Sequence, residues 1–147
     1  MRIAIAQLPG PPRGADRVAV TGNAVVVLDG ASAIEPVSVP PGVYADHLGK
    51  AITAALSADP GAGLRDVLAE AIAATAGELG LAGDDCPSST LAVIRVGGQV
   101  DLLVLGDSFI FFYDTGSGLT ATDRCESQTY RHSCVHTSAA SVTAYSR

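Results

Sequence analysis

The sequence predicts a single α+β domain built from layers of helices and strands. Segments with the two-residue periodicity of β-strands come first, segments with helical periodicity follow, and strand-like segments then return. The helices therefore form one block and do not alternate with strands, which is typical of an α+β domain and not of a βαβ repeat. The length of 147 residues fits one domain with a substantial core.

The first strand-like segments lie within the N-terminal 30 residues. Residues 2–7 alternate in polarity and end at a proline-rich breaker, so we expect a short strand there. Residues 17–21 and 23–28 are rich in β-branched side chains and flank Gly22, which predicts a hairpin. The second arm is apolar almost throughout, as in a strand that is covered on both faces.

Two helices are predicted in the middle of the chain. Apolar residues recur at helical spacing from Val43 to Leu56, and the Asp-Pro-Gly sequence at 59–61 ends this segment. From Leu64 to Leu79 they recur at i, i+3, i+4 and i+7, the pattern of an amphipathic helix. Glycines 80 and 83 are suited to end it.

Three more strands are expected after the helices, at residues 90–96, 100–105 and 109–113. Residues 120–147 differ in kind, because they contain no Leu, Ile, Phe or Met and about a third of them are Ser or Thr. Such a segment buries too little apolar surface to offset its loss of conformational entropy. We therefore divide the chain into a folded part, residues 1–119, and a disordered or loosely attached tail, residues 120–147.

Composition excludes several classes of partner. The net charge is −6 and Lys and Arg do not cluster, which argues against nucleic-acid binding. No apolar run approaches the roughly 20 residues of a membrane span, and the N-terminal segment does not have the pattern of a secretion signal. The three cysteines lack CxxC spacing. We therefore expect a cytoplasmic protein with no nucleic-acid or membrane partner; composition leaves its oligomeric state open.

Acidic residues mark the ends of several predicted strands. Asp16 precedes one strand, Asp29 follows the next, and Asp107 lies between two others. Carboxylates at the ends of neighbouring strands can converge, and hard divalent cations such as Mg²⁺ bind oxygen ligands of this kind. Each Asp taken alone is more often a turn residue, above all before Gly.

Four short motifs follow one another along the chain: Gly14-Ala-Asp-Arg17, Val25-Val-Val-Leu-Asp-Gly-Ala-Ser32, Pro87-Ser-Ser-Thr-Leu-Ala92 and Val104-Leu-Gly-Asp-Ser108. In this order, with two helices between the second and third, they resemble the PP2C family of metal-dependent Ser/Thr protein phosphatases. The alanine-rich composition and the Asp-Gly-Ala-Ser sequence are similar to PP2C-like proteins of high-GC bacteria. The resemblance covers about residues 1–119.

The resemblance implies an αββα sandwich, here incomplete at its C-terminus, with an Mg²⁺ or Mn²⁺ site at one end of the sheets. It implies hydrolysis of phosphoserine or phosphothreonine in a phosphoprotein substrate through a metal-bound water. By the resemblance, Asp29 is the central metal ligand and catalytic residue, and Gly30 contributes its backbone carbonyl. Asp16 supports the metal site, and Asp107 faces a further, more weakly bound metal.

This sequence departs from the family pattern at several points. The family has an acidic residue where Ala15 stands, and Arg13 is offset from the position of the phosphate-binding arginine, to which Arg2 or Arg17 could be nearer. The further Asp ligands of the family's second half have no counterpart after Gly118. One hypothesis for the tail is an altered or truncated C-terminus produced by a shifted reading frame.

Two other functions compete with the phosphatase reading. A non-catalytic PP2C-like module that binds a regulatory protein partner agrees with Ala15 and with the missing ligands. A GDSL-type esterase would use Ser108 as nucleophile, but that motif comes late here and no His has an Asp three residues before it. Zinc binding by the tail is disfavoured, because the C-x6-H-x-C-x-H spacing does not match a known arrangement of ligands. The four residues in question are Cys125, His132, Cys134 and His136.

Overall fold

The fold was analysed in a computed structural model that describes residues 2–7, 14–31, 37–82, 86–114, 118–122, 130–132 and 142–145. The helices are α1 (Pro41–Ala58) and α2 (Leu64–Leu79). The strands are β1 (Arg17–Val20), β2 (Ala24–Gly30), β3 (Ser89–Val96), β4 (Val100–Leu105), β5 (Phe109–Asp114), β6 (Gly118–Thr122), β7 (Tyr130–His132) and β8 (Val142–Tyr145).

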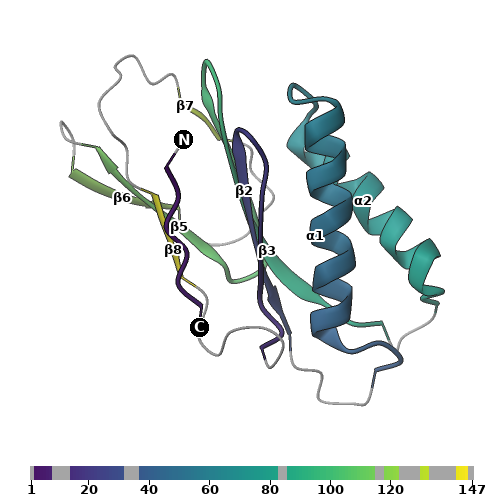
Figure 1. Cartoon of the computed structure of the whole chain (residues 1–147). Helices are drawn as coiled ribbons and strands as arrows, with labels where there is room; N and C mark the ends of the chain where they lie inside the picture. The colour runs from purple at the N-terminus through teal and green to yellow at the C-terminus, as the bar shows by residue number, and fades with distance from the viewer. Residues whose placement is uncertain are drawn as a thin grey trace.

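The described elements form three layers (Figure 1). The helices cover one face of an antiparallel sheet with strand order β1-β2-β3-β4-β7, and a second sheet of order β6-β5-β8 lies on the other side. This arrangement confirms the predicted α+β class and the helix, sheet and sheet layers of the sandwich. The described residues contain no second helical layer.

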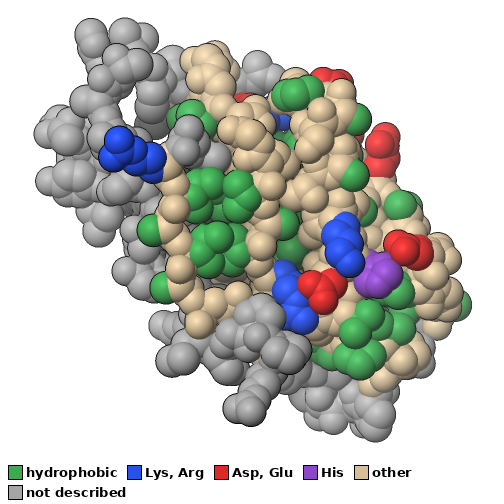
Figure 2. Space-filling view, in the orientation of Figure 1, with side chains coloured by type: hydrophobic (Ala, Val, Ile, Leu, Met, Phe, Trp, Pro, Cys, Tyr) green, Lys and Arg blue, Asp and Glu red, His purple; other side chains and the backbone are tan. Residues whose placement is uncertain are grey.

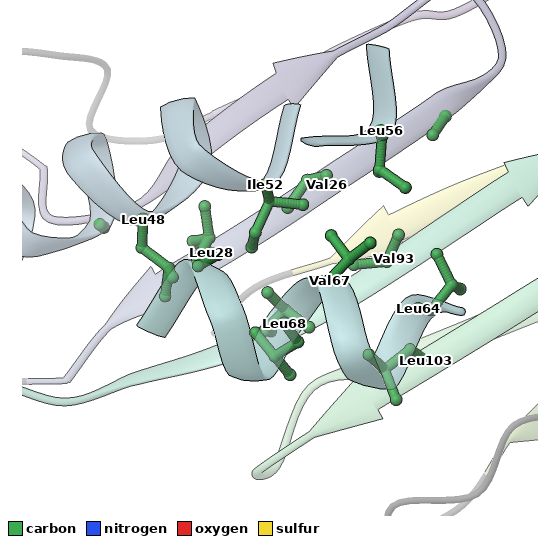
Figure 3. Packing of buried hydrophobic residues seen from close by; sticks show 14 of the residues in the cluster. Val26, Leu28, Leu48, Ile52, Leu56, Leu64, Val67, Leu68, Val93 and Leu103 are labelled. Carbon is green, nitrogen blue, oxygen red and sulfur yellow. The ribbon is translucent and has the colours of Figure 1, made fainter. Parts of the chain in front are cut away.

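The main core lies between the helices and the five-stranded sheet (Figure 3). Burial alternates along β2, whose Ala24, Val26 and Leu28 are all fully buried on the side of the helices. Burying a Val, Leu or Ile side chain stabilises a fold by roughly 1.5–3 kcal/mol, so this face holds the layers together. The helices contribute, among others, Leu48, Ile52, Leu56, Leu64, Val67 and Leu68.

A second, smaller core joins the two sheets. Ile110 of β5 is fully buried and packs with Ala92 and Ile94 of β3 and with Leu102 of β4. These β3 and β4 residues alternate with those that face the helices, so they lie on the opposite face of the five-stranded sheet. The two sheets are therefore stacked face to face.

Most of the predicted elements are confirmed. The hairpin pairs β1 with β2, and its turn is closed by a hydrogen bond of 2.9 Å from the Thr21 amide to the Ala24 carbonyl. Both helices and the three central strands are present. Gly80 ends α2 with a φ of 63°, the left-handed conformation that favours glycine.

The strand predicted at residues 2–7 is wrong, because this segment has no regular secondary structure. Its two isoleucines are 39% and 55% exposed, so the alternation in sequence does not correspond to a buried face. The segment contacts the fold through a polar side chain, with Gln7 Nε2 donating to the Asp16 carbonyl at 2.6 Å.

Short segments of the chain beyond residue 119 are described, and all of them are strand residues. β7 pairs with β4 and β8 pairs with β5, both antiparallel. The rest of residues 120–147, including Cys125 and Cys134, lies outside the described residues, so the boundary at 119 and the nature of the tail stay predictions. Among the helices that the structure describes, none has the length and apolar character needed to cross a membrane.

Candidate functional site

Four of the residues in the sequence motifs form a row across one end of the five-stranded sheet. Asp29 of β2 is paired with Thr90 of β3. Continuing the strand registers by one residue places Asp16 opposite Asp29, and Gly106 opposite Thr90. Because side chains alternate along a strand, Asp29 and Thr90 lie on the face that packs on the second sheet, not on the face that packs on the helices.

The carboxyl groups of Asp16 and Asp29 are close enough to interact directly. The pKa of Asp29 is raised from 3.8 to about 6, first by burial, then by a side-chain hydrogen bond with Asp16 and by the negative charges of Asp16 and Asp107. Such a hydrogen bond requires a proton on one of the two carboxyls. The structure therefore places Asp16 beside Asp29, and it places Asp107 near enough for its charge to raise the pKa of Asp29.

Asp107 lies in a tight turn between β4 and β5 and is exposed. The turn begins at Gly106, whose φ is +85° and whose missing Cβ would lie 2.7 Å from Thr90 Cγ2. Glycine is therefore required there by conformation and by space. Ser108 holds the other end of the turn, because its hydroxyl lies 2.7 Å from the Thr90 hydroxyl.

Gly30 lies in a narrow space beside the segment that carries Asp16. A Cβ on Gly30 would lie 2.8 Å from both the Cβ and the carbonyl oxygen of Ala15, and 3.2 Å from the carbonyl carbon of Pro41. The glycine at position 30 is thus explained by the close approach of three chain segments. Ala15, where the resemblance leads one to expect an acidic residue, lies directly against the end of β2.

Arg17 is not placed to bind a phosphate at this site. It is paired with Leu28, whose side chain faces the helices, so Arg17 projects from the opposite side of the sheet to Asp29. Its Nε donates to Asp46 of α1 at 2.6 Å. Of the other arginines considered for this role, Arg2 lies in the N-terminal segment and Arg13 lies outside the described residues.

The donor set is chemically suited to a hard divalent cation but is sparse. Carboxylates are ligands that Mg²⁺ and Mn²⁺ prefer, and a cation between Asp16 and Asp29 would take the place of their shared proton. In the part of the chain that the structure describes, no three His, Cys, Asp or Glu side chains are grouped closely enough to hold a metal. Two carboxylates alone provide few ligands, so a hard cation held between them would have to complete its shell with water.

Sequence reasoning missed the hydroxyl groups around the carboxylates. Ser89 donates its hydroxyl to the Asp29 carbonyl at 2.9 Å, across 60 residues of sequence, and the adjacent Thr90 holds Ser108. Both belong to the Ser-Ser-Thr sequence at 88–90, which is part of the third family-like motif but to which that motif assigns no role at the site. Their partners depend on the pairing of β2, β3 and β4, for which the sequence carries no local signal.

The other end of the same sheet has a hollow of about 740 Å³, lined in part by Arg65, Arg95 and Asp101. Arg95 is buried and its guanidinium donates to Asp101 Oδ2 and to the carbonyls of Pro60 and Ala62. These bonds attach the loop between α1 and α2 to the sheet. Arg95 is therefore a structural residue, far along β3 from Thr90.

The fold was compared with those of known proteins. No protein-family model matches the sequence, and neither does any curated protein sequence. Solved structures of PPM Ser/Thr phosphatases do match. MsPP from Mycobacterium smegmatis, in complex with cacodylate, aligns over 81% of this chain and 50% of its own, with a TM-score of 0.58 and 22% identity.

Two further solved structures align with this chain to a similar extent. PppA from Pseudomonas aeruginosa, described as a key regulatory component of a T6SS, aligns over 74% of this chain and 48% of its own, at TM-score 0.52 and 26% identity. The catalytic domain of the phosphatase PstP, in complex with two manganese ions, aligns over 76% and 49%, at TM-score 0.53 and 23% identity. The chain therefore has the fold of an N-terminal part of the PPM Ser/Thr phosphatases. This confirms the PP2C-like resemblance, with the chain spanning about half the length of the structures it matches.

Proposed function

We propose that this chain is a metal-dependent phosphatase domain that hydrolyses phosphoserine or phosphothreonine in a protein substrate. The observation that carries the proposal is the Asp16–Asp29 carboxyl pair at the end of the stacked sheets, with the charge of Asp107 nearby. The fold is that of enzymes with this activity, one of which is described with two manganese ions. A cytoplasmic location and a phosphoprotein partner are part of this proposal.

In this proposal Asp29 and Asp16 hold Mg²⁺ or Mn²⁺, together with the Gly30 carbonyl, and Asp107 faces a second, more weakly bound ion. A bound divalent ion would supply positive charge for the phosphoryl oxygens and lower the pKa of a water molecule. The chain's own residues set the geometry: strand pairing holds Asp29 opposite Asp16, and the Thr90–Ser108 contact holds the turn that carries Asp107.

A non-catalytic binding module is the second candidate. It is favoured by Ala15, which removes one carboxylate from the segment beside Gly30, and by the lack of a group of three metal-binding side chains in the described ranges. Such a module would use the same fold to contact a regulatory protein and would not depend on divalent ions.

The experiment is Mn²⁺-dependent hydrolysis of para-nitrophenyl phosphate and of a phosphothreonine peptide by the purified chain. Asp29→Asn removes the central carboxylate with little change in shape. Glu78→Gln is the matched control, because Glu78 is exposed and lies beside His47 on the helices, away from the aspartates. We expect metal-dependent turnover that is lost in Asp29→Asn and kept in Glu78→Gln. Folded protein that shows no turnover at millimolar Mn²⁺ would favour the binding module.

A further inference from the structure

We infer that Arg17 and Asp46 are positioning residues, whose ion pair holds the segment 14–16 so that Asp16 stays beside Asp29. The inference rests on the proposed metal site, since it assigns a role in organising one of its ligands. Arg17 and Asp46 lie on the helix side of the sheet, and the carboxyl pair lies on the other side. The two residues would therefore act through the backbone and not through contact with a bound ion.

Arg17 holds both ends of the three-residue segment. Its Nη1 donates to the Gly14 carbonyl at 2.6 Å and to the Asp16 carbonyl at 2.7 Å. The side chain is only 16% exposed, and hydrogen bonds from a guanidinium group strengthen as water is excluded. The Nη1 nitrogen of Arg17 is therefore bonded to both the first and the last residue of the segment 14–16.

Asp46 in turn anchors the guanidinium to α1. Its Oδ1 accepts a hydrogen bond of 2.6 Å from Arg17 Nε, which orients the planar group for its two carbonyl contacts. Charged side chains of both signs gather over α1 on the face seen in Figure 2. The pair thus joins the helical layer to β1 and its preceding segment.

The start of α1 and the end of β2 also pack against residues 14–16. Gly42 lies one helical turn before Asp46 on the same face of α1. A Cβ on Gly42 would lie 3.0 Å from Arg17 Nη2 and 3.3 Å from Ala15 Cα, and Gly30 approaches Ala15 from the other side. Two glycines therefore allow close contact, and the Arg17–Asp46 pair supplies the directional bonds.

Because side chains alternate along the strand, the position of the Arg17 side chain also sets the direction of the Asp16 side chain. Adjacent residues in extended chain point to opposite faces, so holding Arg17 against the helices turns Asp16 toward the second sheet, where Asp29 lies. Without the guanidinium, Asp16 would keep its backbone contact with Gln7, but the two bonds that span the segment would be lost.

Loss of the Arg17 guanidinium should change the affinity for a cation in the direction opposite to that expected from charge alone. Removing the positive charge of Arg17 near an acidic cluster should tighten cation binding if only charge matters. If Arg17 positions Asp16, its removal should weaken cation binding instead, because one carboxylate leaves the site.

The test is Mn²⁺ binding, measured by loss of the free-ion electron paramagnetic resonance signal, for the wild type, Arg17→Gln, Arg17→Lys and Asp46→Asn. We expect at least tenfold weaker binding for Arg17→Gln, and no full rescue by Arg17→Lys, because an ammonium group lacks the planar fork. The double variant Arg17→Gln/Asp46→Asn should bind no more weakly than Arg17→Gln alone, since the pair acts as one unit. Equal or tighter binding by folded Arg17→Gln would overturn the inference.

A second measurement separates this inference from the proposed function. Backbone ¹⁵N order parameters of residues 14–16 are measured in metal-free protein for Arg17→Gln and for the control Glu78→Gln. We expect them to fall toward about 0.6 in Arg17→Gln and to stay near 0.85 in the control. If the wild type does not bind Mn²⁺, the metal site is refuted and these order parameters alone decide the inference: rigid residues 14–16 in Arg17→Gln would refute it too.

Discussion

The hydroxyls of Thr90 and Ser108 lie 2.7 Å apart, and this contact joins β3 to the turn that carries Asp107. Thr90 is also the strand partner of Asp29, so one residue lies next to two of the three aspartates. A change at Thr90 should therefore affect both stability and the binding of a divalent ion.

Thr90→Val tests this relationship, because valine keeps the shape and removes the hydroxyl. We expect a loss of about 1 kcal/mol in the free energy of unfolding, since the half-buried Ser108 hydroxyl loses its partner. Mn²⁺ binding should also weaken. Thr53→Val on α1 is the control, because the Thr53 hydroxyl donates to carbonyls of its own helix, at Gly49 and Lys50. Equal effects of the two variants on Mn²⁺ binding would contradict the prediction.

The raised pKa of Asp29 predicts a pH dependence of stability. The folded carboxyl titrates at about 6 and the unfolded one near 3.8, so between these values the folded protein retains a proton that the unfolded chain has released. Metal-free stability should therefore fall as the pH rises from about 4 to 6, by on the order of 1 kcal/mol after allowance for solvent screening.

Urea unfolding at a series of pH values measures the slope of the free energy of unfolding against pH. Asp29→Asn should flatten it, and Glu70→Gln, a change on an exposed face of α2, should leave it as it is. Affinity for Mn²⁺ should change in the opposite sense and rise through the same window, because the metal competes with the proton. A slope in Asp29→Asn as steep as in the wild type would show that another group is responsible.

Ala15→Glu restores an acidic side chain next to Asp16. Ala15 is half-buried against Gly30 at the end of β2 and precedes Asp16 in the chain, so a longer acidic side chain there would add a carboxyl group one residue from the Asp16–Asp29 pair. We expect Mn²⁺ to bind at least tenfold more tightly, about 1.4 kcal/mol. Val20→Glu is a control of equal charge, because Val20 is 44% exposed at the other end of β1. Comparable gains in both variants would indicate a general effect of net charge.

Gly30→Ala probes the narrow space between β2, Ala15 and α1. The added methyl would lie 2.8 Å from two atoms of Ala15, one of them a backbone oxygen. We expect a loss of about 1–3 kcal/mol in the free energy of unfolding. Gly77→Ala in α2 is the contrast, since its Cβ would meet no atom within 4 Å and should stabilise the helix by up to about 1 kcal/mol. Calorimetric midpoints that move in the same direction would contradict the packing argument.

The failed prediction at residues 2–7 shows the limit of periodicity. Alternation predicted a strand there and β-branched composition predicted β1, yet of the two segments only β1 pairs with a neighbouring strand, and its first three residues are partly buried. Periodicity describes a face that could be buried. Whether another layer covers it depends on the rest of the fold.

The sequence by itself determined both helices, strands β1 to β5 and the candidate residues. Helical spacing from Val43 to Leu79, the glycine at 80 and the hairpin around Gly22 are local signals, because each reflects backbone preference or periodicity within a few residues. The order of four motifs was enough to indicate the family and to select Asp16, Asp29 and Asp107.

Only the tertiary structure decided how these residues meet. Strand register places Asp16 opposite Asp29 and Thr90 beside it, and a one-residue shift would turn each side chain to the other face. Asp46, the ion-pair partner of Arg17, lies 29 residues further along the chain, on α1. The two side chains meet because α1 packs on the sheet, and no local sequence pattern encodes that packing. Identities of the site residues are thus readable from the chain, and their contacts follow from how its layers pack.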